Sequence, residues 1–224
     1  MKIVSEEDEI KRLAVLSAYE EKYYELGYHY IAGADECGRG CLAGPVAAAA
    51  VILPRGVIIK GINDSKKLSP GRREALCAEI LEKALAVRFE TAGADVIDSI
   101  NILRASLTAM GKALNGLNIK PQAALIDGRF LPDIELRMEP IIGGDGKSVS
   151  IAAASIVAKV LRDALMSRYD ASYPGYGFIR NKGYGTKEHY DALSRLGPCP
   201  IHRMSFNLQG ACYENSHRNK PTHK

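Results

Sequence analysis

The run 31–40, which reads IAGADECGRG, constrains this chain more than any other stretch. It begins with small and apolar residues, as the end of a buried strand does, and then places two carboxylates side by side, Asp35 and Glu36. Neighbouring residues of a strand point to opposite faces, so the two acids share one target only if the strand ends or bends there. The glycines flanking Arg39 let the backbone turn and approach a ligand closely, and Arg39 adds hydrogen-bond donors. A ligand site and an ordinary polar turn are both compatible with this run alone.

Composition limits the class of protein. The 224 residues suit one domain with an extension, and the longest apolar run, 46–53, is of strand length and too short to cross a membrane. The acidic and mixed opening, MKIVSEEDEIKRL, is unlike a secretory signal, so we expect a cytoplasmic protein without a membrane partner. The five cysteines form no CxxC pair, and we expect reduced thiols. The net charge of +4 permits a polyanionic partner without requiring one.

Periodicity and turn residues predict an α/β chain. The segment 44–53, GPVAAAAVIL, alternates little and is expected to be buried on both faces, forming a hairpin with the strand before it. Strands followed by alternating helices and strands predict a mixed sheet flanked by helices. We expect an N-terminal helical arm at 1–28, a core at 29–170, and a C-terminal helical region with a basic tail at 171–224. The predicted helices are 5–26, one opening at 69–70, 95–117, 149–167 and 186–196, and the predicted strands are 30–35, 44–53, 87–93, 123–126 and 134–142.

Acidic residues follow apolar strands beside glycine at three separate places. These are Asp35 with Glu36, Asp127 before a glycine, and Asp145 before another. Each place alone fits a simple turn, but sites collect at strand ends, and three such places favour one shared site. Four carboxylates without a nearby histidine suit Mg²⁺ or Mn²⁺, and two such ions can clamp the attacking water and the leaving oxygen of a phosphodiester.

The glycine-rich turn 143–148, GGDGKS, has a rival interpretation as a phosphate-binding P-loop. That motif requires glycine at the position held by Ile141, so we disfavour it. Lys147 and Ser148 at a helix start can still meet a phosphate, and the alternative is that Ser148 caps the helix.

Basic residues lie in loops and are interleaved with tyrosines near the stretch NKGYGTKEH. The combination of cations, aromatic rings and glycine suits a nucleic-acid backbone, although charge runs are usually only solvated surface. We expect His202 to be structural rather than catalytic.

Several motifs, in order along the chain, resemble those of bacterial ribonuclease HII, the type 2 ribonuclease H family. They are DECGRG, LAGPV, DSKKLS, LIDG, GGDGKS followed by SIAAASIVAKVLRD, NKGYGT and HRMSF, and together they span 30–206. The resemblance implies a ribonuclease H-like fold with a C-terminal helical region. It implies a metal-dependent endoribonuclease that cleaves the RNA strand of RNA–DNA hybrids and incises 5′ of ribonucleotides embedded in duplex DNA, as in ribonucleotide excision repair. The products would carry 3′-hydroxyl and 5′-phosphate ends, the cofactor would be two Mg²⁺ or Mn²⁺ ions, and we expect a monomer.

The resemblance also implies roles for individual residues. The metal-binding carboxylates match Asp35, Glu36, Asp127 and Asp145, the motif that senses the ribose 2′-hydroxyl matches Gly38, Arg39 and Gly40, and the tyrosine that stacks on the junction sugar matches Tyr184. Lys66, Lys67 and Lys182 match positions near phosphates.

Three positions stand apart from these matches. Asp163 lies inside a predicted helix, and we interpret it as structural. Cys37 stands where a small residue such as alanine is usual and Cys41 where proline is common, which affects loop geometry but removes no ligand.

Two other functions stay open on the sequence. One is a non-catalytic nucleic-acid-binding module that keeps the fold, which the intact acidic positions oppose. The other is a metal nuclease of the same fold acting on DNA, which the GRG motif and Tyr184 oppose. The sequence does not identify a sliding-clamp or other protein partner.

Overall fold

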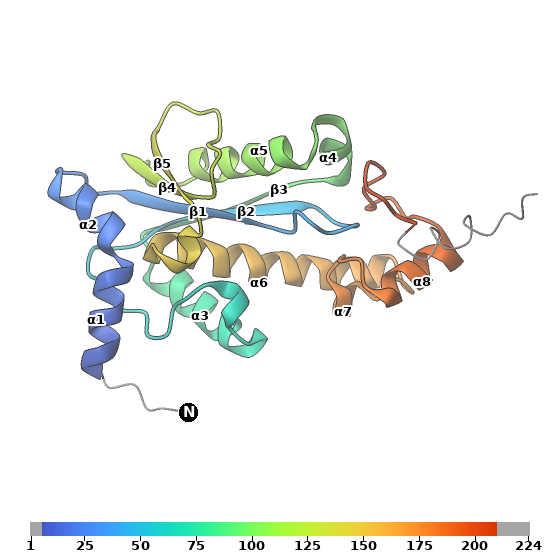
Figure 1. The fold of residues 1–224 in the computed structure, drawn as a ribbon, viewed down its shortest axis with the longest axis horizontal. Helices are drawn as coiled ribbons and strands as arrows, with labels where there is room; N and C mark the ends of the chain where they lie inside the picture. The colour runs from blue at the N-terminus through green and yellow to red at the C-terminus, as the bar shows by residue number, and fades with distance from the viewer. Residues whose placement is uncertain (1–5, 210–224) are drawn as a thin grey trace, which may run out of the picture.

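A mixed five-stranded sheet forms the centre of the computed structural model, which describes residues 6–209 (Figure 1). The strands are β1 (Ile31–Cys37), β2 (Val46–Ile52), β3 (Ala86–Ala92), β4 (Ala123–Asp127) and β5 (Arg137–Ile141). Their order is β3-β2-β1-β4-β5; β1, β2 and β3 pair antiparallel, whereas β4 pairs parallel with β1 and with β5. The predicted hairpin and mixed sheet are confirmed.

Helices cover both faces of this sheet. In Figure 1, α4 and α5 lie on one face and α3 and α6 on the other, with α1 and α2 beyond one end and α7 and α8 at the opposite end. The helices are α1 (Glu6–Leu16), α2 (Ala18–Glu25), α3 (Pro70–Lys83), α4 (Ala94–Ile100), α5 (Ile102–Asn115), α6 (Val149–Ser172), α7 (Phe178–Asn181) and α8 (Lys187–Leu196), with short 3-10 turns η1 (Ser65–Lys67) and η2 (Gly144–Gly146). In the part of the chain that the structure describes, no helix has both the length and the apolarity to cross a bilayer.

Strand β2 is buried on both faces, as its lack of alternation predicts. Ala49 and Val51 pack in the cluster beneath α3 and α6, whereas Ala48 and Ala50 pack in the cluster beneath α5. Small side chains at these positions let both helical layers come close to the sheet.

Gly33 sets the distance between β1 and α6. A Cβ atom added at Gly33 would lie well inside 3.0 Å of the backbone of Ser150 and Ile151, so no other residue fits here without moving the helix. The start of α6 therefore rests directly on the strand that leads to Asp35.

Two predicted helices are each divided. The expected helix 5–26 is interrupted at Ser17, between α1 and α2, and the expected helix 95–117 is interrupted at Asn101, between α4 and α5. Asn101 adopts a φ of 70° and a ψ of 164°, a conformation that residues other than glycine rarely adopt, and its side chain accepts a hydrogen bond from the N–H of Arg104. Helix α6 continues to Ser172, five residues beyond its predicted end at 167. The expected tail at 214–224 lies outside the described residues.

Candidate active site

The acidic residues converge where the parallel strands β1 and β4 end. The β1–β4 pairing stops at Ala34 opposite Ile126, so the next residues of β1 have no partner on that side. Asp35 and Glu36 then line the same cavity as Asp127, although β1 continues to Cys37 and does not end at the acids as the sequence suggested. The open edge, rather than a strand end, lets both side chains reach one space.

Asp145 joins this group from η2, the turn that precedes α6. Asp145 is buried, and the N–H of Gly144 beside it donates a hydrogen bond of 2.7 Å to Oδ1 of Asp127. The turn is held at the start of α6 because the hydroxyl of Ser148 accepts from the N–H of Ile151. The helix-cap interpretation of Ser148 is thus confirmed.

Burial and mutual repulsion dominate the electrostatics of the acids. Asp35 is 4% exposed, and its pKa is raised well above the usual value by burial and then by the charges of Glu36, Asp127 and Asp145. Burial also raises the pKa of Asp127, partly offset by the bond from Gly144, and raises the pKa of Glu36, partly offset by Arg39. These carboxylates therefore hold more negative charge than their surroundings compensate.

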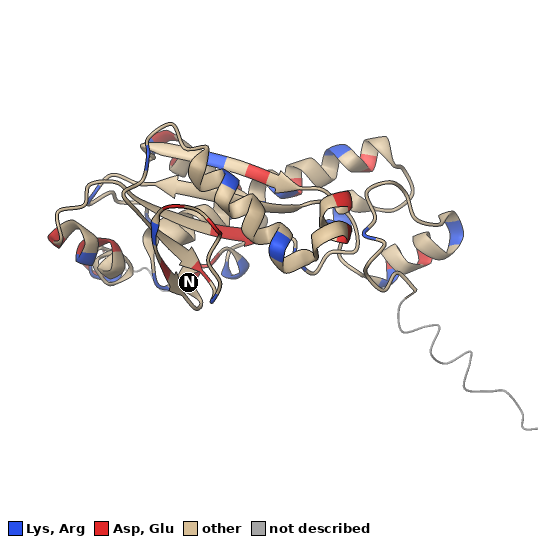
Figure 2. Cartoon of the chain, turned by 90° about the horizontal axis from the view of Figure 1, so that it is seen from above, with Lys and Arg blue, Asp and Glu red and all other residues tan. Residues whose placement is uncertain are grey.

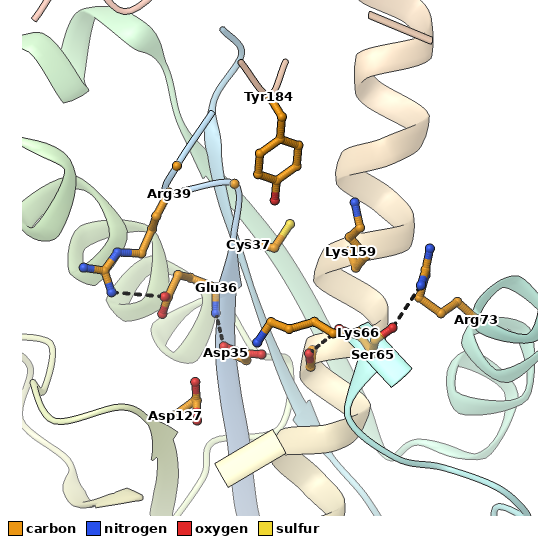
Figure 3. A pocket seen from close by; sticks show the side chains of 13 residues that line it. Asp35, Glu36, Cys37, Arg39, Ser65, Lys66, Arg73, Asp127, Lys159 and Tyr184 are labelled. Atoms are coloured by element: carbon orange, nitrogen blue, oxygen red, sulfur yellow. Dashed lines mark hydrogen bonds and ion pairs between the residues drawn. The ribbon is translucent and has the colours of Figure 1, made fainter. Parts of the chain in front are cut away.

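Two cations lie against the acidic group, both on exposed side chains. Nζ of Lys66 lies 3.3 Å from Oδ2 of Asp145. Nη1 of Arg39 lies 3.3 Å from Oε1 of Glu36 (Figure 3). The Lys66 side chain is 79% exposed. Their partner carboxylates are largely buried, with side chains 9% exposed at Asp145 and 14% exposed at Glu36, so the two cations offset part of the charge of the acidic group.

The acidic side chains, as the structure describes them, do not surround a common metal position. Within residues 6–209, no three His, Cys, Asp or Glu side chains are arranged around a common point as metal ligands. The donor set nevertheless fits a hard divalent cation, because it consists of carboxylate oxygens, and burial and then mutual repulsion raise the pKa values of Asp35 and Asp127.

The turn Gly38–Gly40 forms a second wall of the cavity, which has a volume of about 260 Å³. Gly38 has a φ of 88°, and a Cβ atom there would meet the buried side chain of Arg162. Glycine is therefore required at this position by both conformation and space.

Tyr184 stands at the rim of the cavity, on the far side from Asp127 in Figure 3. Its residue pairs with Cys41 in an isolated bridge, and its side chain is 41% exposed. Nζ of Lys159 lies 5.8 Å from the ring centroid. An exposed aromatic ring beside a cation offers a surface for stacking.

Three of the predicted substrate-binding lysines lie outside the cavity lining. Lys147 lines a different hollow beside α1, and its Nζ donates to the carbonyl of Ile142. Lys67 is exposed. Nζ of Lys182 donates to the hydroxyl of Ser167. Lysines and arginines are spread over both ends of the molecule rather than gathered on one element (Figure 2). Phosphate contacts by these lysines stay predictions.

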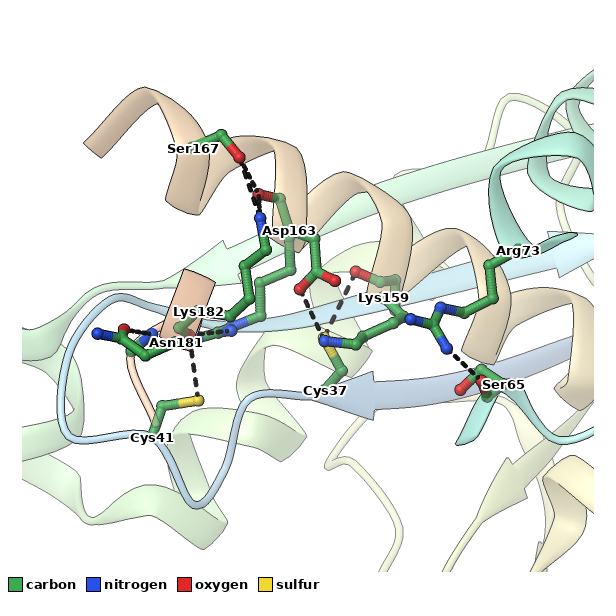
Figure 4. A network of polar contacts seen from close by, with 12 residues as sticks. Cys37, Cys41, Ser65, Arg73, Lys159, Asp163, Ser167, Asn181 and Lys182 are labelled. Atoms are coloured by element: carbon green, nitrogen blue, oxygen red, sulfur yellow. Dashed lines mark hydrogen bonds and ion pairs between the residues drawn. The ribbon is translucent and has the colours of Figure 1, made fainter. Parts of the chain in front are cut away.

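Helix α6 supplies functional candidates that the sequence analysis missed. Ser155 and Lys159 line the cavity, and Nζ of Lys159 lies 2.7 Å from Oδ1 of Asp163, one turn further along (Figure 4). Asp163 pairs with this lysine, and its structural role stays a prediction. The spacing of four residues between Ser155, Lys159 and Asp163 is the signal that identifies one helix face. Arg73, whose Nη1 donates to the carbonyl of Ser65, also lines the cavity.

The cysteine nearest the acids is not a reactive thiol. Burial raises the pKa of Cys37 to about 12, and its Sγ donates to the carbonyl of Ala158 at 3.4 Å. Four cysteines are unpaired within residues 6–209, and Cys212 lies outside the described residues.

Comparison with known proteins gives the family. The ribonuclease HII family model matches residues 32–209. The chain is 53% identical over 198 residues to ribonuclease HII of Moorella thermoacetica, covering 88% of this chain and 96% of that relative, and 52% identical to ribonuclease HII of Ruminiclostridium cellulolyticum, covering 88% and 78%.

Solved structures share the fold. Ribonuclease H2 from Pyrococcus horikoshii has a TM-score of 0.67 at 26% identity and covers 85% of this chain and 100% of its own. Bst-RNase HIII in complex with Mn²⁺ has a TM-score of 0.66 at 20% identity, covering 87% and 72%, and shows the fold alone. The match over most of the chain, with the acidic cavity at the ends of β1 and β4, means that this chain belongs to the ribonuclease HII family and is an endonuclease of the ribonuclease H type.

Proposed function

We propose that this enzyme cleaves the RNA strand of RNA–DNA hybrids and incises 5′ of single ribonucleotides embedded in duplex DNA, leaving 3′-hydroxyl and 5′-phosphate ends. The observation that supports this most directly is one cavity lined by Asp35, Glu36 and Asp127 together with the Gly38–Gly40 turn and Tyr184. The carboxylates suited to hydrolysis therefore line the same cavity as the turn and the aromatic ring, which are suited to recognising the sugar of a ribonucleotide.

We propose that Asp35, Glu36, Asp127 and Asp145 hold two divalent ions, Mg²⁺ or Mn²⁺. Bound there, the ions would stabilise charge on the reacting phosphate and activate the attacking water. The raised pKa values of Asp35 and Asp127 support this, because burial and then mutual repulsion raise them and a divalent cation would offset both effects. Lys66, paired with Asp145 and mostly exposed, is free to turn to a phosphate oxygen as the substrate binds.

Discrimination of the ribonucleotide would come from the turn and the tyrosine together. A 2′-hydroxyl both donates and accepts hydrogen bonds, and the backbone of a glycine turn can reach it because no side chain intervenes. A ring stacked on the next sugar favours deoxyribose there, because a second 2′-hydroxyl would crowd it. Tyr184 at the rim, half-exposed, suits that role.

The test is cleavage of three matched duplexes with Mg²⁺ or Mn²⁺: one with a single ribonucleotide, one continuous hybrid, and one entirely of DNA. We expect cleavage of the first two and none of the third. Tyr184→Ala should lose more activity on the single ribonucleotide than on the hybrid, and Tyr184→Phe should lose less than alanine. Equal losses on both substrates, accompanied by a lower melting temperature, would mean that Tyr184 only packs the loop.

The same assay separates the alternatives. A non-catalytic binding module would bind the duplexes without hydrolysis, and a DNA-directed metal nuclease would cut the all-DNA duplex.

We also propose that the enzyme acts as a cytoplasmic monomer, with arm 1–28, core 29–170 and C-terminal region 171–224 as its functional parts.

A further inference from the structure

Arg203 is a fully buried cation whose hydrogen bonds go to backbone carbonyl groups. Its guanidinium donates to Gly38 and Arg39, both at 2.7 Å, and to Gly44 at 3.0 Å. Its exposed fraction is 0%, and burial lowers its pKa to about 10. Burying a guanidinium costs several kcal/mol, so an apolar side chain would fill this space at lower cost. The guanidinium holds two carbonyl groups of the turn and, beyond it, the carbonyl group of Gly44.

These bonds fix which way the turn faces. In a trans peptide, the C=O of one residue and the N–H of the next point in opposite directions. Because the carbonyl groups of Gly38 and Arg39 point to Arg203, the N–H groups of Arg39 and Gly40 point away from it. Within residues 6–209, neither N–H donates to another residue, and both residues line the acidic cavity. The bonds to Arg203 thus leave the N–H groups of Arg39 and Gly40 facing away from Arg203, without a hydrogen-bond partner among the described residues.

A buried pair of histidines makes a second connection, from His202 to Tyr184. Nδ1 of His202 lies 2.9 Å from the backbone N of Cys199 and 3.2 Å from the carbonyl oxygen of Cys199. The carbonyl of Tyr184 can only accept from Nδ1 of His189, so the consistent neutral arrangement has His202 accepting from Cys199 at Nδ1 and carrying its proton on Nε2. That Nε2 lies 3.0 Å from Nε2 of His189, which must accept, and Nδ1 of His189 then donates to the carbonyl of Tyr184 at 3.0 Å. The relay works only with both rings neutral, and burial lowers the pKa of each.

Backbone bonds tie the same segments together. The segment after the turn lies between two others: the N–H of Leu42 donates to the carbonyl of Gly183 at 2.7 Å, and the N–H of Gly44 donates to the carbonyl of Ile201 at 2.8 Å. The N–H of Arg203 closes the arrangement by donating to the carbonyl of Leu42 at 2.9 Å. The turn and the tyrosine loop therefore cannot shift independently while these bonds persist.

We propose that His202 and Arg203 are positioning residues that hold the Gly38–Gly40 turn and the Tyr184 loop in one fixed arrangement and so set the enzyme's preference for a single ribonucleotide in DNA. This rests on the proposed function, in which the turn and Tyr184 read the junction. Neither residue lines the cavity, so both act through the groups that they hold.

The first variant is Arg203→Lys, which keeps a buried cation but loses the fork that reaches three carbonyl groups. The matched control is Asp98→Asn, because Asp98 accepts bonds from the N–H groups of Met204 and Ser205 and so anchors the same segment without touching the turn. We expect Arg203→Lys to lose about tenfold more kcat/KM on the single-ribonucleotide duplex than on the continuous hybrid, and Asp98→Asn to lose equally on both. Combined with Tyr184→Ala, Arg203→Lys should cost less than the sum of the two separate losses.

A second pair of variants tests the relay if Arg203→Lys does not fold. His189→Asn keeps a donor at the δ position for the carbonyl of Tyr184, whereas His189→Gln moves that donor away. We expect the glutamine variant to lose preference for the single ribonucleotide and the asparagine variant to retain it. Hydrogen exchange of peptides covering 38–44 and 183–186 should rise in the glutamine variant, and thermal unfolding of each variant gives the folded fraction.

The outcomes separate this proposal from the proposed function. If the wild type does not incise at a ribonucleotide, the proposed function fails. If the wild type and Tyr184→Ala behave as expected but Arg203→Lys loses equally on both substrates, or additively with Tyr184→Ala, then Arg203 and His202 are ordinary packing and the positioning role is refuted. Equal behaviour of His189→Gln and His189→Asn would refute the relay.

Discussion

Replacing Gly33 by alanine tests the closest contact in the molecule. The added Cβ atom would lie well inside 3.0 Å of backbone atoms of Ser150 and Ile151, whereas unstrained carbon contacts begin near ~3.5 Å. No side chain can rotate away to make room, because the obstacle is the main chain of α6 at its first turn.

The size of the effect follows from that geometry. Overpacking a core costs about 1–3 kcal/mol, and a clash with main chain that cannot rotate away belongs at the upper end, so Gly33→Ala should lower the free energy of unfolding by about 3 kcal/mol. For a domain of this size, that corresponds to a melting temperature lower by about 6–12 °C. Displacing α6 also moves Asp145, which immediately precedes it, away from Asp35, and a displacement near ~1 Å can reduce activity about 100-fold.

Urea unfolding and ribonucleotide incision per folded molecule measure the two effects. The control is Gly71→Ala, in the first turn of α3, where an added Cβ meets nothing within 4 Å. It should stabilise the protein by about 0.4–1 kcal/mol and leave activity unchanged. If the free energy of unfolding of Gly33→Ala lies within about 1 kcal/mol of the wild-type value, the close approach of β1 and α6 does not limit this position, and the reasoning fails.

Three further predictions concern charge. Asp35→Asn or Asp127→Asn should abolish turnover yet leave duplex binding nearly intact, since only hydrolysis requires the ions; full activity with Mg²⁺ in either variant would contradict the proposed site. Lys66→Ala should weaken binding to all duplexes alike and reduce the slope of log affinity against log salt concentration by about 1. Lys67→Ala serves as a comparison, because Lys67 is exposed and does not line the cavity. If Lys66→Ala leaves binding unchanged between low and moderate salt, Lys66 is only a solvated side chain. Burial lowers the pKa of His202 from 6.5 to about 4, so this residue leaves stability unaffected above about pH 7. Below pH 6.5 the unfolded chain takes up a proton that the folded chain does not, which lowers the free energy of unfolding by about 2 kcal/mol at pH 5. Urea unfolding at pH 7 and pH 5 should therefore show a smaller fall in this free energy for His202→Asn than for the wild type, and equal falls would contradict the neutral relay.

Local sequence determined most of the elements of this fold. The unalternating alanines of 46–51 specify a strand buried on both faces, and Ser69 with Pro70 specifies the start of α3, where the Ser69 hydroxyl accepts from the N–H of Arg72. Both are decided within a few residues, by burial pattern and by cap chemistry. The breaks at Ser17 and Asn101 were missed because apolar spacing continues through them.

The acidic cluster was predictable because its members follow strands, and strands of one parallel sheet end at a common edge. Asp127 is the last residue of β4, whereas Asp35 and Glu36 reach the same cavity from within β1, beyond the point where its pairing with β4 stops. The sequence does not say that β1 runs on past its acids, because that depends on where pairing with β4 stops.

The chain by itself therefore determined the kind of residues in the site, their order and the family to which they belong. Only the tertiary structure decided that Lys159 lines the cavity while Lys147 does not, and that Arg203 holds a turn more than 160 residues earlier in the chain. Short-range patterns record which face of a helix or strand is buried. They do not record which distant carbonyl group a buried donor will find, because that partner is chosen only when the layers pack.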